Sequence, residues 1–275
     1  MENGEIFNVL HELGFEYARR LSARGVPYAA FRIVGVPGTA ETGVTAIGEH
    51  GVFRLTSHRI DTAADALALV RIGARFPLGA AYRSPADGSA ELSVSVFVGD
   101  AALTREIVSP LLDYLVEASA ALGTGGAAPR RPVMTDETAV PAVDIRAALA
   151  TYGHQLTPQG HGFRMAVPLS PHLGCSIVLR DEADAWLSAS ASYVPEQRLP
   201  AGEPALGELQ KLQRWTAAGR FVLDDTLLLR AEVMTPFLGQ VTAAAVVWTA
   251  SQCAAMLQTA ARSPGLMASQ DRPNS

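Results

Sequence analysis

Residues 203–238, EPALGELQKLQRWTAAGRFVLDDTLLLRAEVMTPFL, decide the fold of this chain. Leucines at helical spacing predict a helix that ends before Gly219, and two apolar runs after it predict a hairpin that leads into another helix. Residues 61–100 repeat this order, with an apolar helix, the segment ARFPL, the alternating strand ELSVSVFV and Asp100 as a helix cap. The repetition predicts that an ancestral unit was duplicated.

Upstream of each of these stretches, the sequence predicts one helix and three strands. The expected strands are 28–36, 42–48 and 51–57 in the first half, and 162–168, 174–180 and 185–193 in the second. Short matches accompany the shared order: Phe31-Arg32-Ile33 with Phe163-Arg164-Met165, and Arg75-Phe76-Pro77-Leu78 with Arg220-Phe221-Val222-Leu223. The predicted fold class is therefore α+β, a tandem duplication of an α-βββ-α-ββ-α module with antiparallel sheets and helices packed on one face.

The domain boundary is expected in residues 123–141, GTGGAAPRRPVMTDETAVP, which combine glycine, proline and charge without periodicity. This composition predicts a linker between independently packed units, with a first module in residues 1–122 and a second in 142–262. The polar residues 263–275 are predicted to form a disordered tail. At 275 residues the chain is long enough for two such modules, each with its own core.

The net charge and the N-terminal sequence predict a soluble protein with no basic surface for binding polyanions. The net charge of −5 and the pI near 5.7 make direct binding of nucleic acid unlikely. The acidic N-terminus lacks the basic region of a signal peptide. The alanine-rich stretch 241–257 is too polar for a bilayer span and predicts a buried helix. We expect a cytoplasmic protein with no membrane contact.

Catalytic motifs are weak throughout the sequence. The acidic residues 181–184 follow an apolar strand as in helicase-type ATPases, but Lys211 lies within a predicted helix and no phosphate-binding loop precedes it, so a hairpin turn is expected. His154, His161 and His172 lack the spacing of metal ligands. We therefore predict no catalytic, cofactor-binding or metal-binding residue.

The two cysteines, Cys175 and Cys253, lie far apart in apolar stretches. Such a pair is no disulfide framework, and both are expected to be buried, reduced thiols. Cys175 is expected on the apolar face of a strand, where nothing stabilises a thiolate, so it is not a predicted nucleophile.

The helix ending in Gly219, the segment Arg220-Phe221-Val222-Leu223-Asp224 and the strand Leu227-Leu228-Leu229-Arg230-Ala231 resemble the YbjN family, which is itself similar to type III secretion chaperones. The resemblance covers residues 142–261 and, more weakly, 5–122. It implies a non-enzymatic protein that binds other proteins, often as a dimer, in bacterial stress or secretion. With two copies in one chain, either the halves form an intramolecular pseudo-dimer or the chain forms a homodimer.

Aromatic residues are the candidates for binding an unidentified protein partner. Trp186 and Phe97 fall on the serine-bearing side of alternating strands, and Trp215 lies at the flank of an apolar helix stripe. Large aromatics on a polar face are common interface anchors. Phe31, Phe76, Phe163 and Phe221 are instead expected in the core. The alternative function is that of a nucleic-acid-associated factor, which acts with or beside a DNA- or RNA-binding partner. It would use arginines against phosphates: Arg19, Arg20, Arg24, Arg130 and Arg131.

Overall fold

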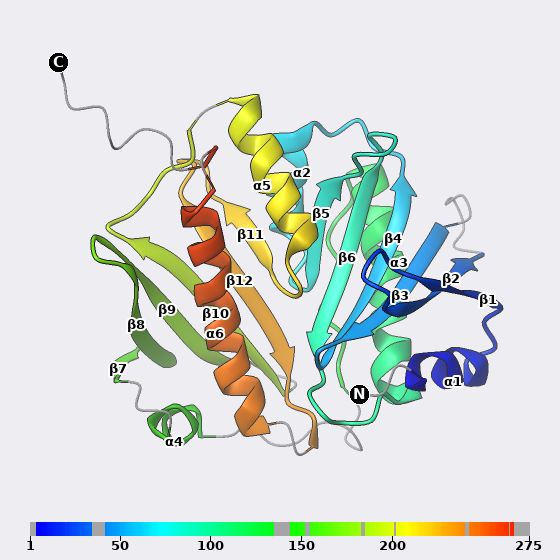
Figure 1. The fold of residues 1–275 in the computed structure, drawn as a ribbon, viewed down its shortest axis with the longest axis horizontal. Helices are drawn as coiled ribbons and strands as arrows, with labels where there is room; N and C mark the ends of the chain where they lie inside the picture. The colour runs from blue at the N-terminus through cyan, green and yellow to red at the C-terminus, as the bar shows by residue number, and fades with distance from the viewer. Residues whose placement is uncertain are drawn as a thin grey trace.

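The computed structural model describes residues 4–34, 42–134, 144–151, 155–182, 185–200, 202–239, 242–263 and 265–266. These residues form two six-stranded antiparallel sheets and the helices that pack on them (Figure 1). We call the elements α1 to α3 the first module and the elements α4 to α6 the second module.

The two modules have the same order of elements. The first contains α1 (Glu5–Glu12), β1 (Tyr17–Leu21), β2 (Pro27–Ile33), β3 (Thr42–Glu49), β4 (Val52–Ile60), α2 (Ala66–Gly73), β5 (Gly79–Arg83), β6 (Ala90–Phe97) and α3 (Arg105–Thr124). The second contains α4 (Ile145–Ala150), β7 (Leu156–Gln159), β8 (Gly162–Ser170), β9 (Leu173–Glu182), β10 (Trp186–Val194), α5 (Glu203–Trp215), β11 (Arg220–Leu223), β12 (Leu229–Pro236) and α6 (Thr242–Ala261). The strand orders, β1-β2-β3-β4-β6-β5 and β7-β8-β9-β10-β12-β11, are also equivalent.

This architecture confirms the predicted α+β class and the similarity of the two halves. Each module, however, has four strands before its second helix, where the sequence predicts three. The missed strands are β1 and β7, which lie at sheet edges. Most residues of β1 are exposed on both faces, so its side chains do not alternate in hydropathy, and β7 contains Pro158, which is tolerated at an edge.

Several predicted boundaries are wrong. Helix α2 begins after Asp65, whose side chain accepts a hydrogen bond from Ala68 N at 2.7 Å, and not after Asp61. Helix α3 begins after Thr104 and not after Asp100. The segment 75–78 forms the turn before β5, whereas the matching segment 220–223 forms β11. That sequence match therefore pairs positions that are not structurally equivalent.

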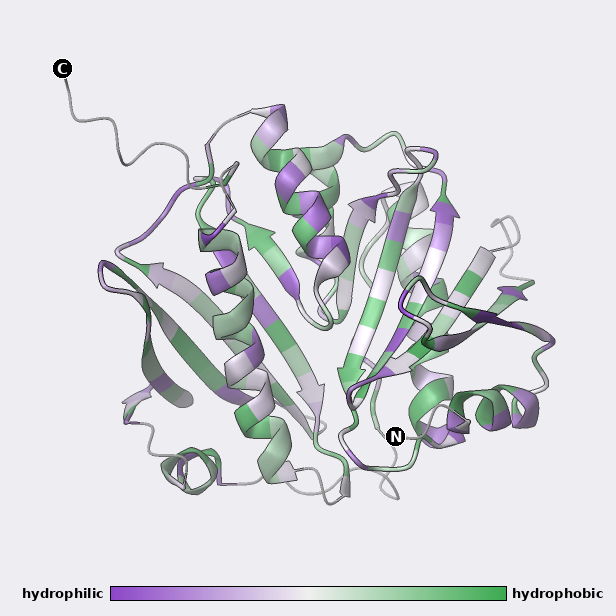
Figure 2. Cartoon of the chain, viewed as in Figure 1, coloured by the Kyte–Doolittle hydropathy of each residue, from purple (hydrophilic) through white to green (hydrophobic). Residues whose placement is uncertain are grey.

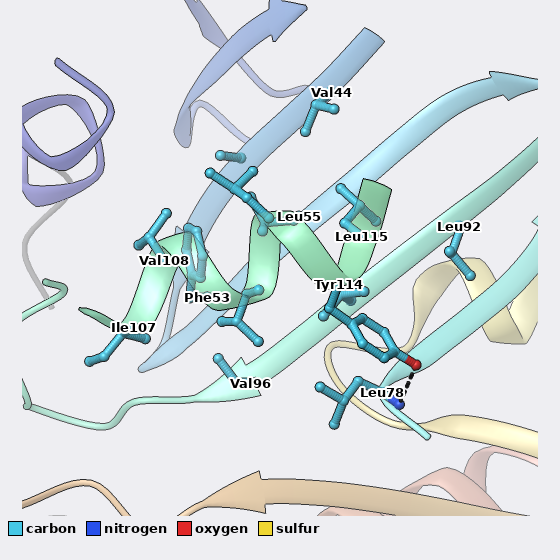
Figure 3. Packing of buried hydrophobic residues seen from close by; sticks show 14 of the residues in the cluster. Val44, Phe53, Leu55, Leu78, Leu92, Val96, Ile107, Val108, Tyr114 and Leu115 are labelled. Atoms are coloured by element: carbon cyan, nitrogen blue, oxygen red, sulfur yellow. Dashed lines mark hydrogen bonds between the residues drawn. The ribbon is translucent and has the colours of Figure 1, made fainter. Parts of the chain in front are cut away.

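The core of the first module lies between α3 and one face of its sheet (Figure 3). Leu55 and Leu92 from the sheet meet Leu115 from the helix, and all three are fully buried. Tyr114 lies in the same layer and accepts a hydrogen bond from Leu78 N at 3.3 Å; burial raises the pKa of its hydroxyl to about 12. Burying each such side chain contributes about 1.5–3 kcal/mol, which makes this layer a main source of stability.

The second module packs α6 across β10 and β12 in the same manner. Cys253 of α6 lies over both strands, and Tyr193 donates a hydrogen bond to Leu257 O at 2.7 Å. Phe221 is buried here, as Phe31 and Phe76 are in the first module, which confirms three of the four predicted core phenylalanines. Phe163 is only partly buried, because it lies on β8 near the edge of the sheet.

Equivalent elements of the two modules meet at their junction. Helix α2 contacts α5, β5 contacts β11, and β6 contacts β12, while each helix also touches the strand of the opposite module. Figure 1 shows α6 in front of its sheet and α3 behind the other. Gln210 on the buried side of α5 accepts from Arg83 N at 2.6 Å and donates to Ala66 O at 2.9 Å. The halves of the chain thus pair with each other.

The predicted linker does not separate independent units. Trp186 Nε1 donates to Pro132 O at 3.1 Å, and Met134 is buried in the first core. That core also includes Trp186 and Leu238 from the second module. Ser263 and Leu266, predicted in a disordered tail, are buried as well, and Ser263 donates to Glu208 at 3.0 Å. The rest of that prediction, residues 264 and 267–275, lies outside the described residues.

Candidate functional site

A groove of about 610 Å³ opens between the two modules. Its walls come from the turn after β1, the β3–β4 hairpin, the end of α5 and one side of α6. The lining residues are Ser22, Ala23, Arg24, Ile47, Glu49, His50, Val52, Arg54, Arg214, Trp215, Ala217, Trp248 and Gln252. Its volume lies within the range of about 300–1,000 Å³ that is typical of ligand sites.

Trp215 stands at the C-terminal end of α5 and is the most exposed aromatic among the groove residues. Pro204 at the start of this helix and a run of good helix formers explain why α5 extends this far. The Trp215 side chain is 70% exposed, and the guanidinium of Arg24 lies 5.9 Å from its ring centroid. A large exposed aromatic beside a cation is a suitable anchor for a partner.

Arg54 of β4 lines the groove and holds the end of α5 against the first sheet. Its guanidinium donates to Ser95 Oγ at 3.3 Å, to Arg214 O at 3.5 Å and to Thr216 O. Burial lowers the pKa of Arg54 below its usual value, whereas nearby Glu49 acts to raise it. Carbonyls at a helix C-terminus carry partial negative charge, so Arg54 fixes the position of Trp215 by attraction to them.

Trp248 of α6 forms the apolar wall opposite. Its ring is stacked on Phe97 of β6, with centroids 4.5 Å apart and planes inclined by 13°. This contact joins the two modules beneath the groove. Val52 and Ile47 of the first sheet continue the apolar surface, so the groove has a hydrophobic base and a charged rim.

The rim is locally basic although the chain is acidic. Arg24, Arg54 and Arg214 oppose a single carboxylate, that of Glu49, and His50 lies 3.4 Å from Glu49. The whole chain has a net charge of −5. The groove is therefore a site where positive charge is gathered against the overall balance.

The three aromatic residues predicted to bind a partner have different places in the structure. Trp186 is fully buried under the linker segment, with Arg131 5.8 Å from its ring centroid, and Phe97 is 8% exposed beneath Trp248. The prediction that the serine side of β6 faces solvent is wrong, because the second module covers it; Figure 2 shows the alternating hydropathy of this strand. Only Trp215 is accessible to a partner.

The weaker chemical motifs remain scattered. β9 ends at Glu182 and β10 begins at Trp186, as expected of a hairpin; Ala183 and Asp184 lie outside the described residues. Lys211 pairs with Glu208 on α5 at 3.2 Å. Among the residues described, no three or more His, Cys, Asp or Glu side chains gather around a metal-sized site, and His154 lies outside them.

Both cysteines are free and buried, as predicted. Burial raises the pKa of the Cys175 thiol to about 11 and raises that of Cys253 further. Because the thiolate is the reactive form, both groups are poor nucleophiles at neutral pH.

The first sheet carries a hydroxyl–imidazole–carboxylate chain that was not predicted from the sequence. Thr45 Oγ1 lies 2.9 Å from His58 Nε2, and His58 Nδ1 lies 3.0 Å from Glu91 Oε1. The three residues come from adjacent strands, so only the strand register brings them together. The three groups stand in the order of a hydrolytic triad, and His58 lies where a bulge between Ser57 and Ile60 interrupts the pairing of β4 with β6. We interpret it as a cross-strand polar contact.

Comparisons with family models, curated proteins and solved structures give no match for the chain. Within the described ranges, none of the helices has the length and apolar character needed to cross a bilayer.

Proposed function

We propose that the chain is a non-enzymatic, chaperone-like adaptor that captures another protein in the groove between its modules. The exposure of Trp215 beside that groove is the observation that carries the proposal. Exposed aromatics at the centre of a concave surface dominate binding energy in protein interfaces. The proposal includes a kinship with YbjN and secretion chaperones, a cytoplasmic location and a role in bacterial stress response.

The internal pairing of the modules supports this function. In the described chain, elements of the first module contact the equivalent elements of the second. The groove exists only because the modules are paired, since its walls come from both. Binding of a partner therefore requires the folded, complete chain.

A photo-crosslinking amino acid placed at position 215 tests the proposal. The expected result is one dominant protein adduct recovered from a bacterial lysate at close to stoichiometric yield. The matched control is the same amino acid at Val194, which is 54% exposed on β10 and does not line the groove. Equal crosslinking at both positions, or none at 215 in stressed and unstressed cells, contradicts the proposal.

Direct binding of nucleic acid is the second candidate, and the pairing of Arg24 with Trp215 is the observation in its favour. Aromatic side chains and cations together bind single strands by stacking and charge. The other predicted arginines are placed differently: Arg19 lies 4.6 Å from the Phe7 ring centroid, and Arg131 lies over Trp186. A steep loss of binding with added salt would favour this alternative.

A further inference from the structure

We infer that the groove recognises a protein segment that carries a carboxylate close to a large apolar side chain. This inference rests on the proposed function and specifies the chemistry of its partner. It follows from the division of the groove into an apolar base and a cationic rim.

The base provides the site for the apolar side chain. Trp248 is held rigidly by its stack on Phe97, and Val52 is fixed within the first sheet. Trp215 of α5 lines the same groove and is exposed. A rigid apolar surface binds without a large loss of conformational entropy, so a buried Leu, Phe or Trp of the partner gains most of its transfer free energy here.

The rim provides the site for the carboxylate. The Arg54 guanidinium is already bound to backbone carbonyls and Ser95. Arg24 and Arg214 are exposed, and no described carboxylate lies in ion-pair range of either. Arginine forks bind carboxylates by two parallel hydrogen bonds, so these two side chains are suited to an Asp or Glu of the partner.

The same charges favour an acidic peptide over a nucleic acid. Glu49 belongs to the wall of the groove, and the whole chain carries −5, so a polyphosphate meets repulsion both locally and at long range. A single carboxylate on an apolar segment needs only the two rim arginines. Charge complementarity therefore selects a peptide with few acidic groups.

Panning of a random peptide library against the full chain tests this inference. The wild type is expected to enrich peptides with Asp or Glu adjacent to Leu, Ile, Phe or Trp. The double variant R24E/R214E should instead enrich Lys or Arg at that place. It should also bind the wild-type peptides at least roughly tenfold more weakly, because a hydrogen bond to a charged group is worth about 1.5–3 kcal/mol.

The variant R105E/R146E is the matched control, since it changes the net charge equally at two exposed helical arginines outside the groove. It should behave as the wild type does. Equal binding of the selected peptides by R24E/R214E, or enriched peptides without acidic residues, would overturn the inference.

Trp215→Ala separates this inference from the proposed function. If enriched peptides lack acidic residues but lose binding in W215A, the groove remains a protein site and only the acidic preference is overturned. If W215A binds every peptide as the wild type does, or if the wild type enriches none, the proposed function fails as well. A labelled oligothymidylate is the probe for the alternative. If it binds more tightly than the peptides and its binding is lost in R24E/R214E, the groove is a nucleic-acid site and the inference is overturned.

Discussion

Arg220 joins the two modules, and replacing it with methionine tests how much the junction contributes to stability. Its guanidinium donates to Glu232 Oε2 from Nε at 3.1 Å and from Nη2 at 2.7 Å. Nη1 donates to Gly73 O at 3.0 Å and to Phe76 O, both in the first module. Only 11% of the Arg220 side chain and 24% of that of Glu232 are exposed.

The substitution Arg220→Met leaves one half-buried carboxylate without its counter-charge and two carbonyls without their donor. Removing one partner of a buried pair costs about 3–5 kcal/mol. Because Glu232 retains partial contact with water, we expect a loss at the lower end, about 3 kcal/mol in the free energy of unfolding. Adding Glu232→Leu should recover part of this loss, since it removes the uncompensated charge.

Urea unfolding followed by tryptophan fluorescence measures this change directly. Trp186, Trp215 and Trp248 all lie at the junction or in the groove, so their emission reports separation of the modules. Arg146→Met on the exposed side of α4 is the control, and it should change stability by less than about 0.5 kcal/mol. A loss below about 1 kcal/mol for Arg220→Met, or no recovery in the double variant, would refute the reasoning.

Three further outcomes follow from the packing. Phe221→Ala should lower the free energy of unfolding by about 3–5 kcal/mol through cavity formation, since Phe221 is 3% exposed; a loss below about 1 kcal/mol in urea melts contradicts its burial. Trp248→Ala should remove the stack on Phe97 and cost up to about 3 kcal/mol, since Trp248 is only partly buried; the thermal midpoint measures the loss against a Trp215→Ala control that changes little. Cys175 and Cys253 should resist a thiol reagent at pH 8 until urea unfolds the chain. Rapid labelling of the native protein would count against this burial. Because burial raises the pKa of Cys175 on folding, the unfolded state holds fewer protons than the folded state between about pH 9 and 11, so the free energy of unfolding should fall as the pH rises.

The sequence predicts the repeated architecture because that architecture depends on local periodicity. β6 shows this best, with Leu92, Val94 and Val96 alternating with polar residues. Edge strands such as β1 are not predicted, because strand residues that are exposed on both faces need not alternate between apolar and polar side chains. Both helix starts are misplaced for lack of a decisive local signal. Asp65 and not Asp61 caps α2, and α3 begins after Thr104, whose side chain forms no capping hydrogen bond.

The candidate site was only partly predictable for a different reason. Trp215 is exposed, as its position at the edge of a helix stripe predicts. Trp186 and Phe97 lie on the serine-bearing sides of their strands, as the sequence predicts. What covers those sides is the other module or the linker, and contacts over such sequence distances leave no local pattern. The same holds for the groove, whose walls come from segments as far apart in the sequence as Ser22 and Gln252.

Because both modules belong to one polypeptide, their sequences need not be identical. In an assembly of two equal subunits, every recess at the contact appears twice with the same residues. Here Trp215 and Trp248 line the groove and both belong to the second half, so the equivalent positions of the first half need not carry the same residues. The covalent tether also keeps the halves at an effective concentration on the order of millimolar, so their asymmetric pairing should persist at any dilution of the protein.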